Sequence, residues 1–331
     1  MEKKAFMYPF IFKPILKDYI WGGTAIRPFK GLPPSEEIVA ESWELSHVKG
    51  NNSVVANGLL EGRTIDELIN QFGAKLCGEK VMQRFGATFP LLIKFLDARQ
   101  DLSIQVHPDD KMAWERHRSF GKTEMWYVVK AAPGAALYSG FSQQIDADEY
   151  VRRVGDNSIT EVLKRYEVKE GDVFFLPAGR VHAVCAGCFI AEIQQTSDIT
   201  YRIYDYNRTD ATGKSRELHT GLAKEAIDYT VYPDYRTAYI PEPNKVVPLV
   251  QCPYFTANLL DLDLPNERDF AGLDSFIIYI CIGGKAILRD NDSNEIAINR
   301  GQTVLFPAET RNITIAPNPK LKLLEVYISV E

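Results

Sequence analysis

The spacing of apolar residues along the chain changes several times between the period of a helix and that of a strand. Residues 64–85 have the helical period, with apolar side chains recurring on one face. Thr64 followed by Glu67 has the spacing of a capping box, which starts a helix. We therefore expect this segment to be helical up to the region of Pro90.

Alternating and continuous apolar runs favour strands over much of the remaining chain. Before residue 55 the pattern is irregular and strand-like. Later strands are expected at residues 91–106, 125–129, 172–176 and 188–195. Short helices are expected at residues 110–118, within 145–166, and near 215–229.

Four prolines crowd residues 233–248 and indicate a linker. After it, residues 250–331 have an all-β pattern, with turn signals at Gly283-Gly284 and at Asp290–Asn294. We therefore predict two domains, residues 1–240 and residues 241–331. Helices are expected to decorate only the first.

Two segments of the chain resemble each other. Gly171-Asp-Val-Phe-Phe-Leu-Pro-Ala-Gly-Arg-Val-His182 and Gly301-Gln-Thr-Val-Leu-Phe-Pro-Ala-Glu-Thr-Arg-Asn312 have the same spacing from glycine to proline. Asn312 stands where His182 stands in the first copy. An internal repeat of this kind predicts two related β-barrel units.

Composition and charge limit the kinds of molecule that the protein is expected to bind. The formal net charge is −6 and no dense run of Lys and Arg occurs, which disfavours nucleic acid as a ligand. Prolines and lysines interrupt the apolar N-terminal patch, and no stretch approaches the ~20 apolar residues of a membrane span. Five cysteines form no disulfide framework. We expect a cytoplasmic protein without nucleic-acid or membrane partners.

The clearest chemical signal is the run Ser103-Ile-Gln105-Val-His107. Side chains alternate along a strand, so Ser103, Gln105 and His107 share one face. Three polar groups aimed in one direction need partners if they are buried, and a metal ion provides them. The alternative is the solvent-facing side of an edge strand.

Two further segments add compatible side chains. Lys122 and Glu124 project together if a strand has begun there, although a surface ion pair is the simpler interpretation. His182 follows a Pro-Ala-Gly turn, where a lone histidine is more often exposed or packed in a core. Together with Gln105 and His107, however, Glu124 and His182 form a nitrogen and oxygen ligand set. Such a set suits Zn²⁺ with one position open.

Six segments in order resemble the type I mannose-6-phosphate isomerases, and most closely their shorter bacterial members, from about residue 15 to 210. They are Trp21-Gly-Gly, Glu41-Ser-Trp-Glu-Leu-Ser46, Ser103-Ile-Gln-Val-His-Pro108, Lys122-Thr-Glu124, Pro177-Ala-Gly-Arg-Val-His182 and Glu192-Ile-Gln-Gln-Thr-Ser-Asp-Ile-Thr-Tyr-Arg-Ile-Tyr-Asp205. The resemblance implies two cupin-like (jelly-roll) β-barrels with helical insertions in the first. It also implies one zinc ion per chain.

Carried over by position, the resemblance assigns the zinc ligands to Gln105, His107, Glu124 and His182. The large helical insertion of the longer relatives is not evident, which implies a more open substrate pocket.

The resemblance also implies catalytic roles for Arg202, Lys122 and Glu192. Ser103, Lys122 and Arg202 are then the substrate-binding residues. Glu192 is our candidate for the base, with Asp198 and a zinc-bound water as rivals. The alternative for Glu192 is a buried structural carboxylate paired with Arg202.

The implied reaction interconverts mannose 6-phosphate and fructose 6-phosphate, with a proton moving between C2 and C1 through a cis-enediol. The expected partner is therefore a small sugar phosphate, and the expected assembly is a monomer or a homodimer. Two alternatives stay open: a non-catalytic sugar-phosphate sensor on the same scaffold, and a different metal-dependent cupin enzyme such as a dioxygenase.

Other residues are expected to have structural roles. Cys185 and Cys188 have the spacing of a metal or redox pair but no second pair, so we interpret them as residues of a turn. Trp21, Trp43 and Trp126 are candidates to line a sugar site, but core packing is the expected role for each. Structural or exposed positions are expected for His47, His117 and His219.

Overall fold

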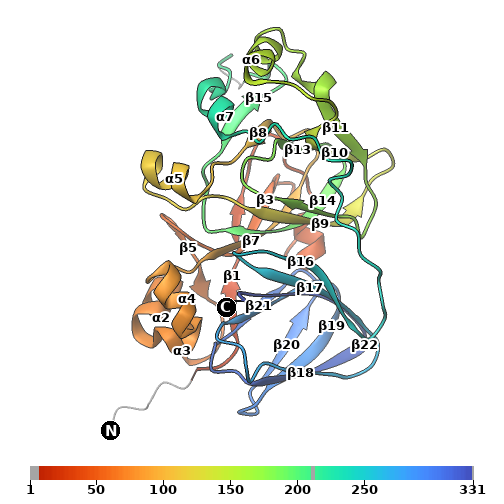
Figure 1. The fold of residues 1–331 in the computed structure, drawn as a ribbon. Coiled ribbons are helices and arrows are strands. Elements are labelled where there is room, and N and C mark those ends of the chain that lie inside the picture. The colour runs from red at the N-terminus through yellow and green to blue at the C-terminus, as the bar shows by residue number, and fades with distance from the viewer. Residues whose placement is uncertain (1–6, 210–212, 330–331) are drawn as a thin grey trace.

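Two β-units are stacked one above the other in the computed structural model, which describes residues 7–209 and 213–329 (Figure 1). The first unit has a six-stranded sheet, in the order β12-β9-β14-β7-β3-β2, and a five-stranded sheet, in the order β11-β10-β13-β8-β15. Apolar residues of both sheets form one buried cluster, so the sheets enclose an interior between them. The mainly-β, cupin-like fold predicted from the sequence is confirmed.

The bounds of the strands in the first unit follow. The six-stranded sheet contains β2 (Ile15–Lys17), β3 (Glu41–Leu45), β7 (Leu91–Asp97), β9 (Glu124–Ala131), β12 (Val173–Leu176) and β14 (Cys188–Gln195). The five-stranded sheet contains β8 (Ile104–Val106), β10 (Ala136–Phe141), β11 (Leu163–Glu167), β13 (His182–Val184) and β15 (Tyr201–Tyr204).

The C-terminal unit is built on a larger sheet whose main path is β16-β17-β22-β19-β21-β1-β6, with β18 beside β22 and β20 beside β19. Its strands are β1 (Phe10–Lys13), β6 (Val54–Val55), β16 (Val246–Gln251), β17 (Thr256–Leu262), β18 (Asn266–Asp269), β19 (Ile277–Asp290), β20 (Glu295–Asn299), β21 (Thr303–Phe306) and β22 (Asn312–Tyr327). The N-terminal strand β1 therefore pairs with this unit through β21. Division of the chain near residue 240 stays a proposal.

Short helices and one small hairpin complete the described chain. They are α1 (Ile26–Lys30), η1 (Gly58–Leu60), α2 (Ile65–Phe72), α3 (Ala74–Cys77), α4 (Glu79–Phe85), α5 (Asp110–His117), α6 (Ala147–Gly155), η2 (Ile159–Val162), α7 (Thr220–Ala226), and the hairpin strands β4 (His47–Val48) and β5 (Asn51–Asn52). The capping box predicted at Thr64 and Glu67 is present at the start of α2. No helix within the described residues is long and apolar enough to cross a membrane.

Two predictions about strands are wrong. Residues 91–106 form two strands in opposite sheets, β7 and β8, because the chain crosses between the sheets after Asp97. Gly283 and Gly284 lie inside β19, where the register with β22 shifts on both sides of them. Gly284 has φ +74° and a Cβ there would lie 1.9 Å from Lys320 O, so this glycine permits a β-bulge between tightly paired strands.

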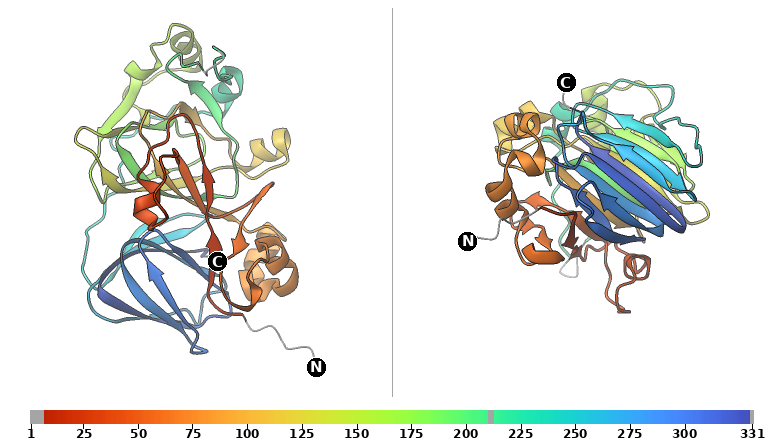
Figure 2. Two further views of the ribbon diagram at one scale, coloured as in Figure 1. Left: turned by 180° about the vertical axis from the view of Figure 1, so that it is seen from behind. Right: turned by 90° about the horizontal axis from the view of Figure 1, so that it is seen from below.

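The two units meet through one apolar core. On the six-stranded sheet, alternate residues such as Ile93, Met125 and Ile193 point away from the interior of the first unit. They belong to the same buried cluster as Leu259 and Ile278 of the C-terminal sheet. Figure 2 shows the strands of the two units lying over each other in layers when seen from below. The other face of the six-stranded sheet is thereby left to line the interior of the first unit.

The internal repeat seen in the sequence extends to the structure. In both segments a glycine with positive φ precedes a four-residue strand, a turn follows the proline, and the next strand begins at His182 or Asn312. Arg180 N donates to Pro177 O in the first turn at 3.0 Å, and Thr310 N to Pro307 O in the second at 2.9 Å.

Cross-strand pairing extends this correspondence to polar residues. In the first unit, Trp126 of β9 pairs with Glu192 of β14, which in turn pairs with Lys94 of β7. The C-terminal unit has a corresponding row of cross-strand pairs.

Phe174 of β12 is the other cross-strand partner of Trp126, and the repeat aligns Phe174 with Val304. Val304 pairs with Tyr279, Tyr279 with Glu325, and Glu325 with Asn258. A buried carboxylate thus occupies the same place in both units.

Donors from the chain itself surround Glu325, which has no solvent exposure. Arg268 Nε and Nη2 donate to its two oxygens at 2.8 and 2.9 Å. Tyr279 Oη donates at 2.9 Å and Asn258 Nδ2 at 3.0 Å. The charge and the hydrogen-bond acceptors of the Glu325 carboxylate are therefore matched by groups of the chain itself.

We expect Arg268→Ala to lower the free energy of unfolding by about 3 kcal/mol, because it leaves the Glu325 carboxylate buried without a cation. The double variant Arg268→Ala/Glu325→Gln should recover most of this loss. Urea denaturation of the two variants and the parent chain provides the measurement. Equal losses in the single and double variants would contradict the ion-pair explanation.

Candidate active site

Strands of both sheets bring four of the predicted site residues together in the first unit. Gln105 lies in the middle of β8, His107 directly after it, Glu124 begins β9 and His182 begins β13. Gln105 pairs across strands with His182 on one side and with Arg202 on the other. Ligand atoms of His107, Glu124 and His182 all lie within 4.8 Å of one another, and all three residues are buried.

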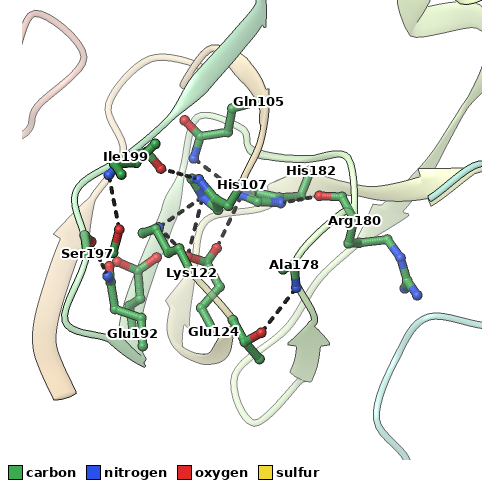
Figure 3. A network of polar contacts seen from close by, with 12 residues as sticks. Gln105, His107, Lys122, Glu124, Ala178, Arg180, His182, Glu192, Ser197 and Ile199 are labelled. Atoms are coloured by element: carbon green, nitrogen blue, oxygen red, sulfur yellow. Dashed lines mark hydrogen bonds and ion pairs between the residues drawn. The ribbon is translucent and has the colours of Figure 1, made fainter. Parts of the chain in front are cut away.

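Backbone carbonyls fix the proton positions on both histidines (Figure 3). His107 Nδ1 donates to Ile199 O, and His182 Nδ1 donates to Arg180 O, each at 2.8 Å. Burial, reinforced by nearby Lys122, lowers the pKa of His107 well below its ordinary value and that of His182 to about 3. Both rings are therefore neutral, with an unprotonated Nε2 turned into the site.

Glu124 faces these two nitrogens. Its Oε1 lies 3.2 Å from His182 Nε2 and its Oε2 lies 3.5 Å from His107 Nε2. Burial raises the pKa of Glu124 to about 7, an effect that Lys122 opposes. Oε1 is buried and accepts no hydrogen bond within the described chain. Acceptor atoms that face each other need a proton or a cation between them, and with the carboxylate ionised this arrangement fits a metal ion.

Gln105 and Lys122 complete this cluster. The side-chain amide of Gln105 lies 3.3 Å from His182 Nε2, and turning the amide over presents its oxygen to the same position. Lys122 Nζ donates to His107 Nε2 at 2.9 Å and also contacts Glu124 Oε2. Its ammonium group therefore shares the acceptors that a metal ion would take.

A cavity of about 330 Å³ opens beside this cluster, a size in the range of small-molecule sites. Its lining includes all the predicted substrate and catalytic residues. The lining residues are Tyr19, Trp21, Glu41, Trp43, Lys94, Leu96, Leu102, Ser103, Gln105, Lys122, Trp126, Glu192, Asp198, Thr200, Arg202, Arg216 and His219.

The partner of Glu192 is Lys94. Lys94 Nζ lies 3.1 Å from Glu192 Oε2, and Trp126 Nε1 donates to Glu192 Oε1 at 2.8 Å. Burial would raise the pKa of Glu192, but Lys94 and Lys122 outweigh it and lower this pKa to about 2. Pairing of Glu192 with Arg202, weighed from the sequence, does not occur among the described residues, where Lys94 takes that place beside the carboxylate.

Arg202 lies half-buried on β15, at the wall of the cavity. Its Nη1 donates to Glu217 O at 3.0 Å. Its Nε is buried and has no hydrogen-bond partner in the described residues. Ser103 lines the same cavity and is buried.

The cavity lining also includes residues to which the sequence assigned no role in catalysis or binding. Lys94 is the most informative, because a lysine within the apolar run Leu91–Asp97 signals a charge buried in a strand. Trp21, Trp43 and Trp126 are buried, as expected of core residues, and they also line the cavity. His219 lines it too, although it was expected to be structural or exposed.

The remaining candidates have structural positions. Cys185 and Cys188 lie at the two ends of the turn between β13 and β14, and burial raises the pKa of each thiol to about 12. Such thiols are poor metal ligands at neutral pH. His47 bonds Asp66 at 2.8 Å, and His117 bonds Tyr201 Oη at 2.8 Å.

Comparison with known proteins agrees with this geometry. Residues 10–126 match the family described as phosphomannose isomerase type I, catalytic domain, and residues 245–328 match mannose-6-phosphate isomerase, cupin domain. Mannose-6-phosphate isomerase ManA of Bacillus subtilis is 38% identical over 257 residues, covering 77% of this chain and 79% of the relative. The chain belongs to the type I phosphomannose isomerases.

Solved structures of type I phosphomannose isomerases extend the likeness to the whole chain. The crystal structure of mannose 6-phosphate isomerase from Bacillus subtilis aligns with a TM-score of 0.86 at 32% identity, covering 97% of this chain and 100% of that one. Phosphomannose isomerase from Salmonella typhimurium aligns with a TM-score of 0.78 at 18% identity, which shows the shared fold.

We expect His107→Ala to lose its bound metal on dialysis, because it removes one of the converging acceptors. Cys188→Ser provides the control, since it alters the cysteine pair while leaving the cluster intact. Metal per chain, measured by atomic emission, should fall in the first variant only. A matched loss in Cys188→Ser would contradict the assignment of that pair to a turn.

Proposed function

We propose that this chain interconverts mannose 6-phosphate and fructose 6-phosphate, with one zinc ion held by Gln105, His107, Glu124 and His182. The observation that supports the metal site most directly is the convergence of acceptor atoms of His107, Glu124 and His182 beside the cavity. Membership of the type I phosphomannose isomerases supports the reaction.

The ligand set favours zinc among common metals. Two imidazole nitrogens, one carboxylate and one amide oxygen suit Zn²⁺ and leave a position for substrate. When bound, the metal supplies Lewis-acid polarisation of the sugar oxygens at C1 and C2. Glu124 is the single anionic ligand, so the metal-loaded site would keep a net positive charge, which favours the negative charge that develops on the sugar oxygens during proton transfer.

Glu192 is our candidate for the base that moves the proton between C2 and C1. Lys94 and Trp126 keep its carboxylate ionised and fix its orientation. A base must be unprotonated and within reach of the substrate, and Glu192 meets the first condition and lines the cavity. Asp198 also lines the cavity and is the rival.

The cations at the cavity have separate roles in this proposal. Lys122 lies beside the metal ligands, where its ammonium group stabilises charge on the sugar oxygens. Arg202 lies on the wall formed by β15 and binds the phosphate, because a guanidinium group suits a phosphate. Ser103 contributes a hydroxyl group to the same substrate.

The two alternatives explain fewer features. A non-catalytic sensor has no need of an ionised carboxylate held ready beside a complete ligand set. A redox dioxygenase usually relies on iron and a histidine-rich set, whereas this site has an amide ligand and several cations suited to phosphate. We retain the monomer or homodimer, the cytoplasmic location and the absence of nucleic-acid and membrane partners as predictions.

Conversion of mannose 6-phosphate to fructose 6-phosphate should disappear after chelation and return on addition of zinc. The purified chain is assayed before treatment, after removal of chelator, and after zinc is restored. Cobalt and magnesium provide comparison metals. Full activity in metal-free protein would refute the metal role, whereas no conversion by zinc-loaded protein would refute the proposed reaction.

We expect Glu192→Gln to lower kcat by about 10²–10⁴-fold while keeping its metal, because it removes the proposed base but preserves the shape of the side chain. Asp198→Asn is the matched comparison. Steady-state kinetics and solvent-deuterium exchange at C1 and C2 provide the measurements. A larger loss in Asp198→Asn than in Glu192→Gln would transfer the role of base to Asp198.

A further inference from the structure

His219 forms two hydrogen bonds with the backbone of Arg202. The backbone N–H of His219 donates to Arg202 O at 2.7 Å, and the ring atom Nδ1 of His219 accepts from the backbone N–H of Arg202 at 3.0 Å. His219 directly precedes α7, and its ring packs 6.3 Å from that of Tyr201. The histidine therefore holds the strand residue that carries the guanidinium group.

These bonds determine where the proton lies on the neutral ring of His219. Because Nδ1 accepts a backbone N–H, it carries no proton, and the proton must be on Nε2. The residue lines the cavity, and no hydrogen bond to Nε2 occurs within residues 7–209 and 213–329. Nε2–H thus has no partner among the described residues, and the side chain that carries it belongs to the cavity lining.

The neighbours of His219 in the cavity suit an anionic group. Arg202 lines the same wall, and its Nε is buried without a partner in the described chain. Arg216 lies there too, although Asp205 binds it at 2.7 and 2.5 Å and so offsets its charge. A phosphate monoester binds well to cations and N–H donors. Arg202, the paired Arg216 and the neutral N–H of His219 provide such groups.

We propose that His219 binds the phosphate of the hexose 6-phosphate through Nε2–H and positions Arg202 through Nδ1. The proposal rests on the proposed function, since it concerns the same cavity and the same substrate. It gives the two nitrogens of one ring separable tasks. One nitrogen contacts the substrate, and the other acts through Arg202.

Amide side chains separate these tasks. His219→Asn places an acceptor close to the position of Nδ1 and removes the Nε2 donor. His219→Gln places an amide N–H close to Nε2 and removes the Nδ1 acceptor. We expect the first to raise KM for mannose 6-phosphate about tenfold with kcat within about twofold, because one bond to a charged group is lost. The second should lower kcat more than it alters KM.

His117→Gln is the control variant. His117 bonds the ring hydroxyl of Tyr201, which neighbours Arg202 in the chain, but it does not line the cavity. Its kcat and KM should match those of the parent chain. Wild-type KM in His219→Asn would overturn the contact with substrate, and wild-type kcat in His219→Gln would overturn the positioning role.

Titration with inorganic phosphate tests the contact without turnover. Isothermal calorimetry on the zinc-loaded parent chain and on His219→Asn should show about tenfold weaker phosphate binding in the variant. Unchanged phosphate affinity would overturn the phosphate contact, even if KM rises. Failure of the parent chain to isomerise mannose 6-phosphate would refute the proposed function instead, and the calorimetric difference would still decide the role of His219.

Discussion

The contact between His182 Nε2 and Glu124 Oε1 imposes a strong constraint on the first unit. Two acceptors 3.2 Å apart, both fully buried, repel each other, and the surrounding protein screens this repulsion poorly. A metal ion between the two atoms relieves it, and so does a proton on the Glu124 carboxyl group, whose pKa burial raises to about 7. Lys122 contacts the other pair of atoms, His107 Nε2 and Glu124 Oε2. The carbonyl groups that fix Nδ1 of each histidine prevent relief by a change of tautomer, so the fold requires either a metal ion or a carboxyl proton at this place.

The six-stranded sheet has two different faces around this site. One face of the six-stranded sheet packs against the C-terminal unit in a continuous apolar core, while the other presents Lys94, Trp126 and Glu192 to the cavity. Strand alternation separates these two environments within a single layer of backbone. The second unit has the corresponding row of cross-strand pairs, and there Arg268 binds Glu325 and neutralises its charge.

Local patterns in the sequence predicted much of this arrangement. The alternation from Ser103 to His107 was sufficient to place those side chains on one face, and the capping box was sufficient to begin α2. Long-range pairing was not predictable. Nothing local indicates that the run from residue 91 to 106 divides between two sheets, or that Gly284 bulges within β19 instead of turning. Lys94 and Glu192 meet only because β7 and β14 are neighbours, and one sequence contains no direct signal for that register.

The shared core between the two units also affects how the chain can be divided. A fragment that ends near residue 240 would keep every residue of the cavity but would expose the apolar back of the six-stranded sheet, including Ile93, Met125 and Ile193. It would also leave β1 without β21. A large exposed apolar surface and an unpaired strand both promote aggregation. The C-terminal unit therefore shields the apolar back of the six-stranded sheet from water within the same chain. A shorter catalyst would first need a replacement for the surface that this unit covers.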